Sequence, residues 1–85
     1  MDNRTKHQLI NVEYVFNHGD ISDAEDRGFT LNEDQLLLAF KDEIDSYKVV
    51  LENAGLESVI IKSVNLKKSK VGNQFVVCFN ALENK

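Results

Sequence analysis

The densest group of carboxylates in the sequence lies between residues 20 and 26, where Asp20, Asp23, Glu25 and Asp26 fall close together. Calcium loops need oxygen ligands at alternate positions, an early glycine and a distant bidentate glutamate, and this spacing does not follow that pattern. Acidic side chains on a surface can instead engage a lysine- or arginine-rich partner and fix its register. We therefore predict a protein-binding site at these four residues. A solvated acidic loop without a partner is the alternative.

The main basic group consists of Lys62, Lys67, Lys68 and Lys70. A basic hairpin can lie along nucleic acid, and each phosphate contact then adds affinity through counterion release. No arginine or aromatic residue is interleaved with these lysines, and the acidic remainder of the chain would repel a polyanion. Nucleic-acid binding is therefore the alternative hypothesis. Lysines that protect an edge strand from aggregation would explain the same residues.

Nucleophilic and metal chemistry find little support in the sequence. Cys78, the single cysteine, lies between Val77 and Phe79 in an apolar run, which is typical of a buried structural thiol. His7 and His18 are far apart in the sequence, and with one cysteine a zinc site of usual composition is excluded. We predict no catalytic residue, no metal and no cofactor, so the protein is not expected to be an enzyme.

Composition indicates a single folded domain over residues 1–85, with 42% hydrophobic and 28% charged residues. The net charge of −4 is unevenly distributed: residues 1–57 carry 13 acidic and five basic side chains (−8), whereas residues 58–85 carry one acidic and five basic (+4). Residues 1–8 form a polar tail without a signal-peptide core, and no run is long enough for a membrane span. Together with the free thiol, this favours a cytoplasmic location.

The first predicted strand covers residues 9–17, where Ile10, Val12, Tyr14 and Phe16 alternate with mostly polar residues. Residues 18–31 are expected to form a long acidic loop, with at most a short helical turn that Ser22 and Glu25 cap and that ends at Gly28. A loop of this length in a small domain is often functional.

A single long helix is predicted over residues 32–55. Asn32 is a suitable N-cap, Leu31 and Leu36 can form a hydrophobic staple, and Gly55 suits the left-handed position after the last turn. Its apolar residues recur at steps of three and four, which places them on one stripe. These residues are Leu37, Phe40, Ile44, Tyr47, Leu51 and Ala54.

Two further strands are predicted over residues 58–68 and 74–82, joined as an antiparallel hairpin by residues 69–73, where Gly72-Asn73 is suitable for the turn. A bulge near Lys62 and Ser63 would reconcile the odd and even apolar positions of the first of these strands. The predicted fold class is α+β: a two-layer β-α-β-β domain with one long helix packed on a three-stranded, mainly antiparallel sheet. The helix stripe is expected to pack on Ile10, Val12, Tyr14, Phe16, Phe75, Val77 and Phe79.

One helix covers only one face of such a sheet, which leaves a second, partly apolar face. Leu9, Val15, Val76 and Cys78 are predicted to lie there, as the interface of a homodimer or of a complex with another protein. We therefore expect a small non-enzymatic cytosolic protein-binding module that acts through its acidic surface, such as an inhibitor or accessory factor. Small phage or mobile-element inhibitors, antitoxins and immunity proteins are of this type. A nucleic-acid-binding protein and a structural homo-oligomer subunit are the alternatives.

Overall fold

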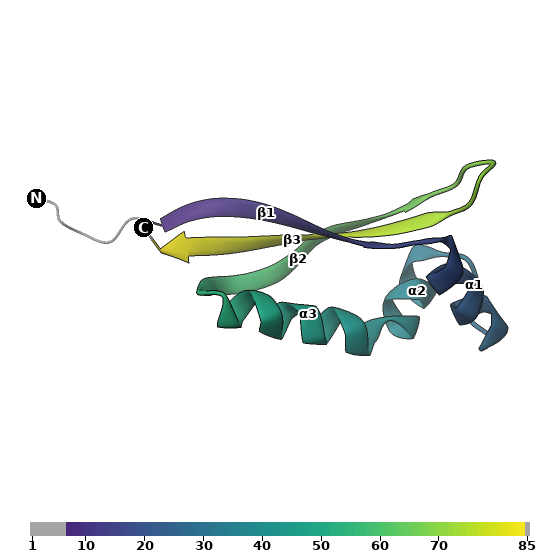
Figure 1. The fold of residues 1–85 in the computed structure, drawn as a ribbon, viewed down its shortest axis with the longest axis horizontal. Helices are drawn as coiled ribbons and strands as arrows, with labels where there is room; N and C mark the ends of the chain where they lie inside the picture. The colour runs from purple at the N-terminus through teal and green to yellow at the C-terminus, as the bar shows by residue number, and fades with distance from the viewer. Residues whose placement is uncertain (1–6, 85) are drawn as a thin grey trace, which may run out of the picture.

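The computed structural model describes residues 7–84 and shows an α+β fold. The elements follow the order β1 (His7–Phe16), α1 (His18–Asp26), α2 (Glu33–Ala39), α3 (Lys41–Asn53), β2 (Leu56–Lys67) and β3 (Gln74–Asn84). The strands form an antiparallel sheet in the order β1-β3-β2, so the last strand is central and the first two strands form the edges. All three helices lie on the same side of the sheet (Figure 1).

The first strand is longer than predicted at its N-terminal end. It starts at His7, so the last two residues of the polar tail predicted at 1–8 belong to β1, and residues 1–6 lie outside the described residues. Its pairing with β3 is unbroken from His7–Asn84 to Phe16–Phe75. As a result, Ile10, Val12 and Tyr14 face the helices together with Phe16, as their alternation predicts.

The prediction of a long acidic loop at residues 18–31 is wrong, because most of this segment forms α1. Asn17 caps the helix: its Oδ1 accepts a hydrogen bond from the Asp20 amide at 3.1 Å, and the Asn17 amide donates to the Asp20 carboxylate at 3.0 Å. The cap therefore precedes the predicted Ser22–Glu25 pair. The helix ends in a Schellman motif at Gly28 (φ 99°), with the amides of Gly28 and Phe29 bonded to Glu25 and Ala24.

The predicted single helix is divided in two at Phe40, which ends α2 and precedes α3. No glycine or proline causes the break. Phe40 has the backbone dihedrals φ −104° and ψ 16°, and its ring stacks on Phe16 at 4.0 Å between centroids. The change of direction turns α2 toward α1 (Figure 1) and buries Leu36 and Ala39, which do not belong to the predicted stripe. The predicted ends hold: Asn32 caps α2, and Gly55 follows α3 with φ 97°.

The hairpin of β2 and β3 and its bulge are confirmed, but the hydrogen-bonded turn spans residues 69–72: the Gly72 amide donates to the Ser69 carbonyl, so Gly72 ends the turn instead of standing at its centre. The β2–β3 register shifts between Ile61 and Ser63, which brings the odd-numbered Val59 and the even-numbered Val64 to the same face. A second shift between Glu57 and Ile60 includes Ser58, whose φ is 53°. Both irregularities lie in the edge strand β2.

The core lies between the sheet and the helices. The predicted contacts are confirmed for Leu37, Phe40, Ile44, Tyr47 and Leu51, which join one cluster with all seven predicted strand residues. Ala54, by contrast, is exposed. The cluster also includes Ile21 and Ala24 of α1, so this segment contributes to the core. None of the helices among the described residues is long and apolar enough to span a membrane.

Candidate functional site

Three of the four predicted binding carboxylates lie on one side of α1. Asp20, Asp23 and Asp26 are three residues apart, which aligns them on a helix face, and they line a pocket of about 470 Å³. Arg27, Phe40 and Glu43 complete its lining. Glu25, the fourth predicted residue, is exposed but does not line this pocket. The helix therefore separates Glu25 from the other three carboxylates.

The carboxylates of this pocket differ in their roles. Asp20 is held by the N-cap of α1, whereas Asp23 and Asp26 are exposed. The one cation in the lining, Arg27, contacts other groups: its Nη2 donates to the Ala39 carbonyl at 3.4 Å, and its guanidinium lies 5.4 Å from the centre of the Phe29 ring. Among the described residues, no lysine or arginine forms an ion pair with Asp23 or Asp26.

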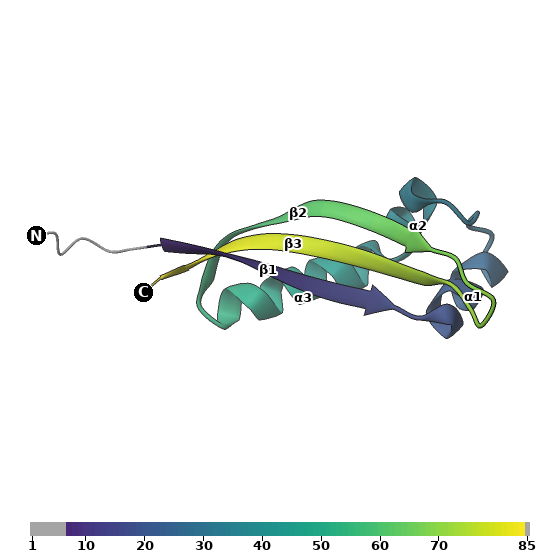
Figure 2. The same ribbon diagram turned by 90° about the horizontal axis from the view of Figure 1, so that it is seen from above.

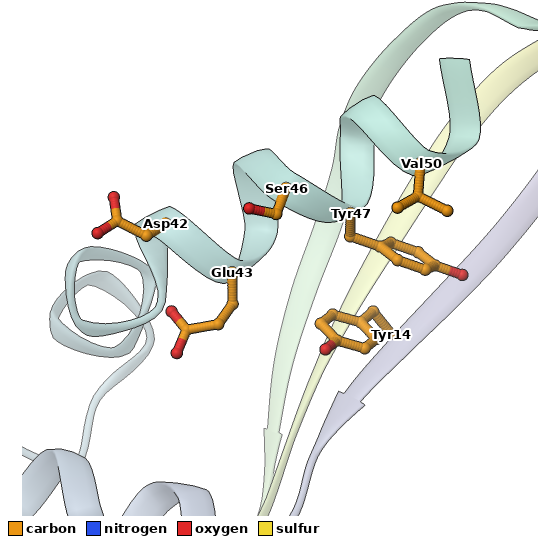
Figure 3. Close-up of a pocket in the computed structure, with 6 residues that line it drawn as sticks. All are labelled: Tyr14, Asp42, Glu43, Ser46, Tyr47 and Val50. Carbon is orange, nitrogen blue, oxygen red and sulfur yellow. The ribbon is translucent and has the colours of Figure 1, made fainter. Parts of the chain in front are cut away.

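A second pocket of about 310 Å³ lies between α3 and β1 (Figure 3). The rings of Tyr14 and Tyr47 stack with 4.5 Å between centroids and an interplanar angle of 11°. Val50, 56% exposed, continues this surface along α3. Asp42, Glu43 and Ser46 supply the polar part of the lining.

Glu43 lines both pockets, so the two adjoin. We call the combined surface the acidic groove and define it by the carboxylates of Asp20, Asp23, Asp26, Asp42 and Glu43 with the rings of Tyr14 and Tyr47. Its carboxylates give it a negative potential, and the tyrosine rings add an aromatic surface. In the described part of the chain, no three His, Cys, Asp or Glu side chains converge closely enough to hold a metal ion.

Sequence reasoning missed the contribution of α3 and β1 to this groove. It assigned Tyr14 and Tyr47 to the core, and Glu43 lay outside the predicted apolar stripe of the helix. Both tyrosines are only partly buried, because they lie at the border of the core beside the edge strand. The groove is lined by residues of α1, α3 and β1 together with Phe40, and no pattern within one element reports that arrangement.

The predicted second sheet face is less open than expected. Leu9 and Val15 on β1 are 61% and 45% exposed, but Val76 is only 4% exposed, because it lies on the central strand between Val15 and Asn65. Cys78 is partly buried. Its Sγ lies 3.6 Å from a carboxylate oxygen of Glu13, a neighbour that the sequence did not indicate. We call this surface the outer face.

The four predicted basic residues are exposed and only partly clustered. Lys67 ends β2, and Lys68 and Lys70 follow in the hairpin loop, whereas Lys62 lies at the bulge. The loop packs on α1: the Asn73 amide is 3.5 Å from His18 Nδ1, which is the acceptor. His18 thus connects the loop to the helix. The side chain of His7 lies outside the described residues.

A further hollow of about 410 Å³ lies on the β2 side of the helices, lined by Leu37, Leu38, Ile44 and Ile61 among others. Beside it, Lys41 Nζ contacts Asp45 Oδ2 at 2.8 Å on the exposed surface of α3. This hydrogen bond, with the attraction between the opposite charges, raises the pKa of Lys41 and lowers the pKa of Asp45. The two side chains are 67% and 57% exposed, so the pair is a surface feature.

Comparison of the chain with known protein families, with curated proteins and with solved structures finds no significant match.

Proposed function

We propose that this protein is a non-enzymatic protein-binding module whose acidic groove binds a lysine- or arginine-rich segment of another protein. The observation that carries the proposal is the position of Glu43, which joins the carboxylates of α1 to the stacked tyrosines of β1 and α3. A module of this kind acts by occupying a basic surface of its partner. That is how an inhibitor or accessory factor works, and we include this role in the proposal.

The chemistry of the groove fits a guanidinium group better than other ligands. Carboxylates accept two parallel hydrogen bonds from arginine, and aromatic faces attract the same cation. Asp23, Asp26 and Glu43 are exposed and have no cationic partner among the described residues, so a ligand would not have to break an existing ion pair. Electrostatic attraction would also accelerate association with a basic partner.

The proposal is tested by titrating the protein with an arginine-rich peptide and following backbone amide shifts by NMR. We expect saturable shifts in α1 and in the first half of α3, together with Tyr14, and weaker binding at higher salt. A glutamate-rich peptide of the same length should cause none. The double variant Asp23→Lys/Glu43→Lys should bind the basic peptide at least about tenfold more weakly, because charged hydrogen bonds contribute roughly 1.5–3 kcal/mol each.

The matched control is Glu25→Lys/Glu52→Lys, which changes the net charge by the same amount at exposed helical positions outside the groove. This variant should retain most of the affinity. Tyr47→Leu should weaken binding without a change in charge, since it removes the ring and keeps an apolar side chain. Equal loss in both charge variants would mean that only net charge matters, and the groove would then be rejected as the site.

A further inference from the structure

The two edges of the sheet differ in how well they are protected from pairing with another strand. Natural proteins protect edge strands with bulges, lysines, prolines or covering groups. β2 contains two register shifts, carries Lys62 and Lys67, and its Leu66 amide donates to the Glu33 carboxylate at 3.2 Å. That hydrogen bond comes from α2 and occupies an edge amide of β2. The β2 edge is therefore blocked.

The β1 edge is less protected than the β2 edge in the described residues, and its one acidic side chain is Glu13. Its pairing with β3 is regular along all 10 residues, and the strand contains neither lysine nor proline. Figure 2 shows β1 along one long side of the sheet with no strand beside its outer edge. A long regular strand of this kind presents unpaired amides and carbonyls to any complementary strand.

We infer that β1 pairs antiparallel with β1 of a second copy of this chain, which makes a continuous six-stranded sheet around a two-fold axis. The symmetry limits the possible registers. Directly opposed residues in an antiparallel pair point to the same face, so a two-fold axis normal to the sheet requires odd positions to face odd positions and even to face even. This condition is satisfied only by registers in which one residue of β1 lies opposite the same residue of the second copy.

One register matches the side chains best, with Val12 opposite Val12 of the second copy. Leu9 then lies opposite Val15 and Asn11 opposite Glu13 on the outer face, while Ile10 lies opposite Tyr14 on the helix face. Moving the axis to Glu13 would place the two Glu13 carboxylates together, which is unfavourable. Moving it to Asn11 would place Leu9 against Glu13. The favoured register pairs nine residues of each strand, from Gln8 to Phe16.

This register also accounts for two exposed apolar side chains. Leu9 and Val15 are 61% and 45% exposed in the single chain. The pairing places Leu9 of each copy opposite Val15 of the other, so this apolar contact occurs twice. A second copy is favoured over an unrelated strand because β1 complements itself in this way. The helices of both copies would lie on the same side of the enlarged sheet, with the Tyr14–Tyr47 stacks on either side of the axis. The inference does not depend on the proposed function of the acidic groove.

The first test is the molar mass of the full chain, measured by light scattering coupled to size-exclusion chromatography over a range of concentrations. We expect a dimer for the parent and a monomer for Leu9→Lys/Val15→Lys, since lysine blocks edge pairing. Ile60→Lys is the matched control: Ile60 is 57% exposed on the outer face but lies on β2, so this variant should remain a dimer. Circular dichroism should show that all three proteins are folded.

The second test fixes the register by disulfide formation in a Cys78→Ala background. Directly opposed residues in an antiparallel pair lie about 4.5–5.5 Å apart between Cα atoms, within the range for a disulfide. Leu9→Cys/Val15→Cys should therefore form a covalent dimer on mild oxidation, whereas neither single variant should do so. Leu9 and Val15 of one strand are too far apart to bond within a chain, so any disulfide reports pairing between copies.

Three results would overturn the inference. They are a parent that stays monomeric at every concentration, a dimer that Ile60→Lys dissociates, and disulfide-linked dimers in either single-cysteine variant. The second would point to packing of the outer faces. The acidic groove is tested separately, because Asp23→Lys/Glu43→Lys should remain a dimer whether or not it binds the basic peptide.

Discussion

Two stacked aromatic pairs connect β1 to the helices. Phe16 stacks on Phe40 with an interplanar angle of 5°, and Tyr14 stacks on Tyr47. The first pair is buried, and its close contact coincides with the break between α2 and α3. The second pair lies at the border of the core and forms the aromatic part of the acidic groove. The Phe16–Phe40 pair thus contributes to core packing, and in our proposal the neighbouring Tyr14–Tyr47 pair contributes to binding.

Val76 gives a residue-scale prediction, because it is 4% exposed although it lies on the face away from the helices. Val76→Ala should lower the free energy of unfolding by about 2 kcal/mol, since it removes buried methyl groups and leaves a small cavity. Ile60→Ala, at a 57% exposed position of the same face, should cost less than about 1 kcal/mol. Urea denaturation measures both values. If both variants lost similarly little free energy of unfolding, the centre of the outer face would be open to solvent.

The contact between the hairpin loop and α1 connects two elements that are far apart in the sequence. Gly72 has φ 144°, and a Cβ atom built there would lie 2.8 Å from Cβ of His18. Gly55, after α3, also has positive φ, but a Cβ atom there would meet nothing within 4 Å. Substitutions at the two glycines therefore distinguish the cost of a left-handed backbone, which both share, from the cost of a close contact, which only Gly72 has.

Alanine substitutions at these glycines are the element-scale prediction. Gly55→Ala should cost about 1 kcal/mol from the left-handed backbone alone. Gly72→Ala should cost about 1–3 kcal/mol more, because the added methyl group displaces the loop from His18. Thermal or urea denaturation gives the ranking. If Gly72→Ala were no worse than Gly55→Ala, the loop would not be packed on α1.

At the scale of the whole molecule, one core cluster includes residues from every helix and strand. We therefore predict a single cooperative unfolding transition. The only two tyrosines form the α3–β1 stack and the chain has no tryptophan, so tyrosine fluorescence reports that contact alone. Its urea transition should coincide with that of far-UV circular dichroism. A fluorescence transition at lower urea concentration would show that the groove opens before the sheet unfolds.

Local sequence patterns were enough to specify the elements whose signals lie within a few residues. Alternation specified β1, Asn32 and Gly55 specified where the helical segment begins and ends, and the change of parity in β2 specified the bulge near Lys62. Much of the core was also predictable, because burial follows the periodicity of each element: all seven predicted strand residues and every residue of the helix stripe except Ala54 join it. Asp20, Asp23 and Asp26 were found as a group, although as part of a loop and without Asp42 and Glu43.

How these elements pack against one another could be seen only in the three-dimensional fold. The break at Phe40 accompanies its stacking on Phe16, which lies on a strand distant in the sequence, so no local breaker marks it. The segment predicted as a loop is a helix in which Asn17, a residue assigned to the preceding strand, provides the cap, and Ile21 and Ala24 pack in the core. The acidic groove and the open β1 edge depend on strand order and helix placement. These are set by contacts between distant segments, which local patterns do not encode.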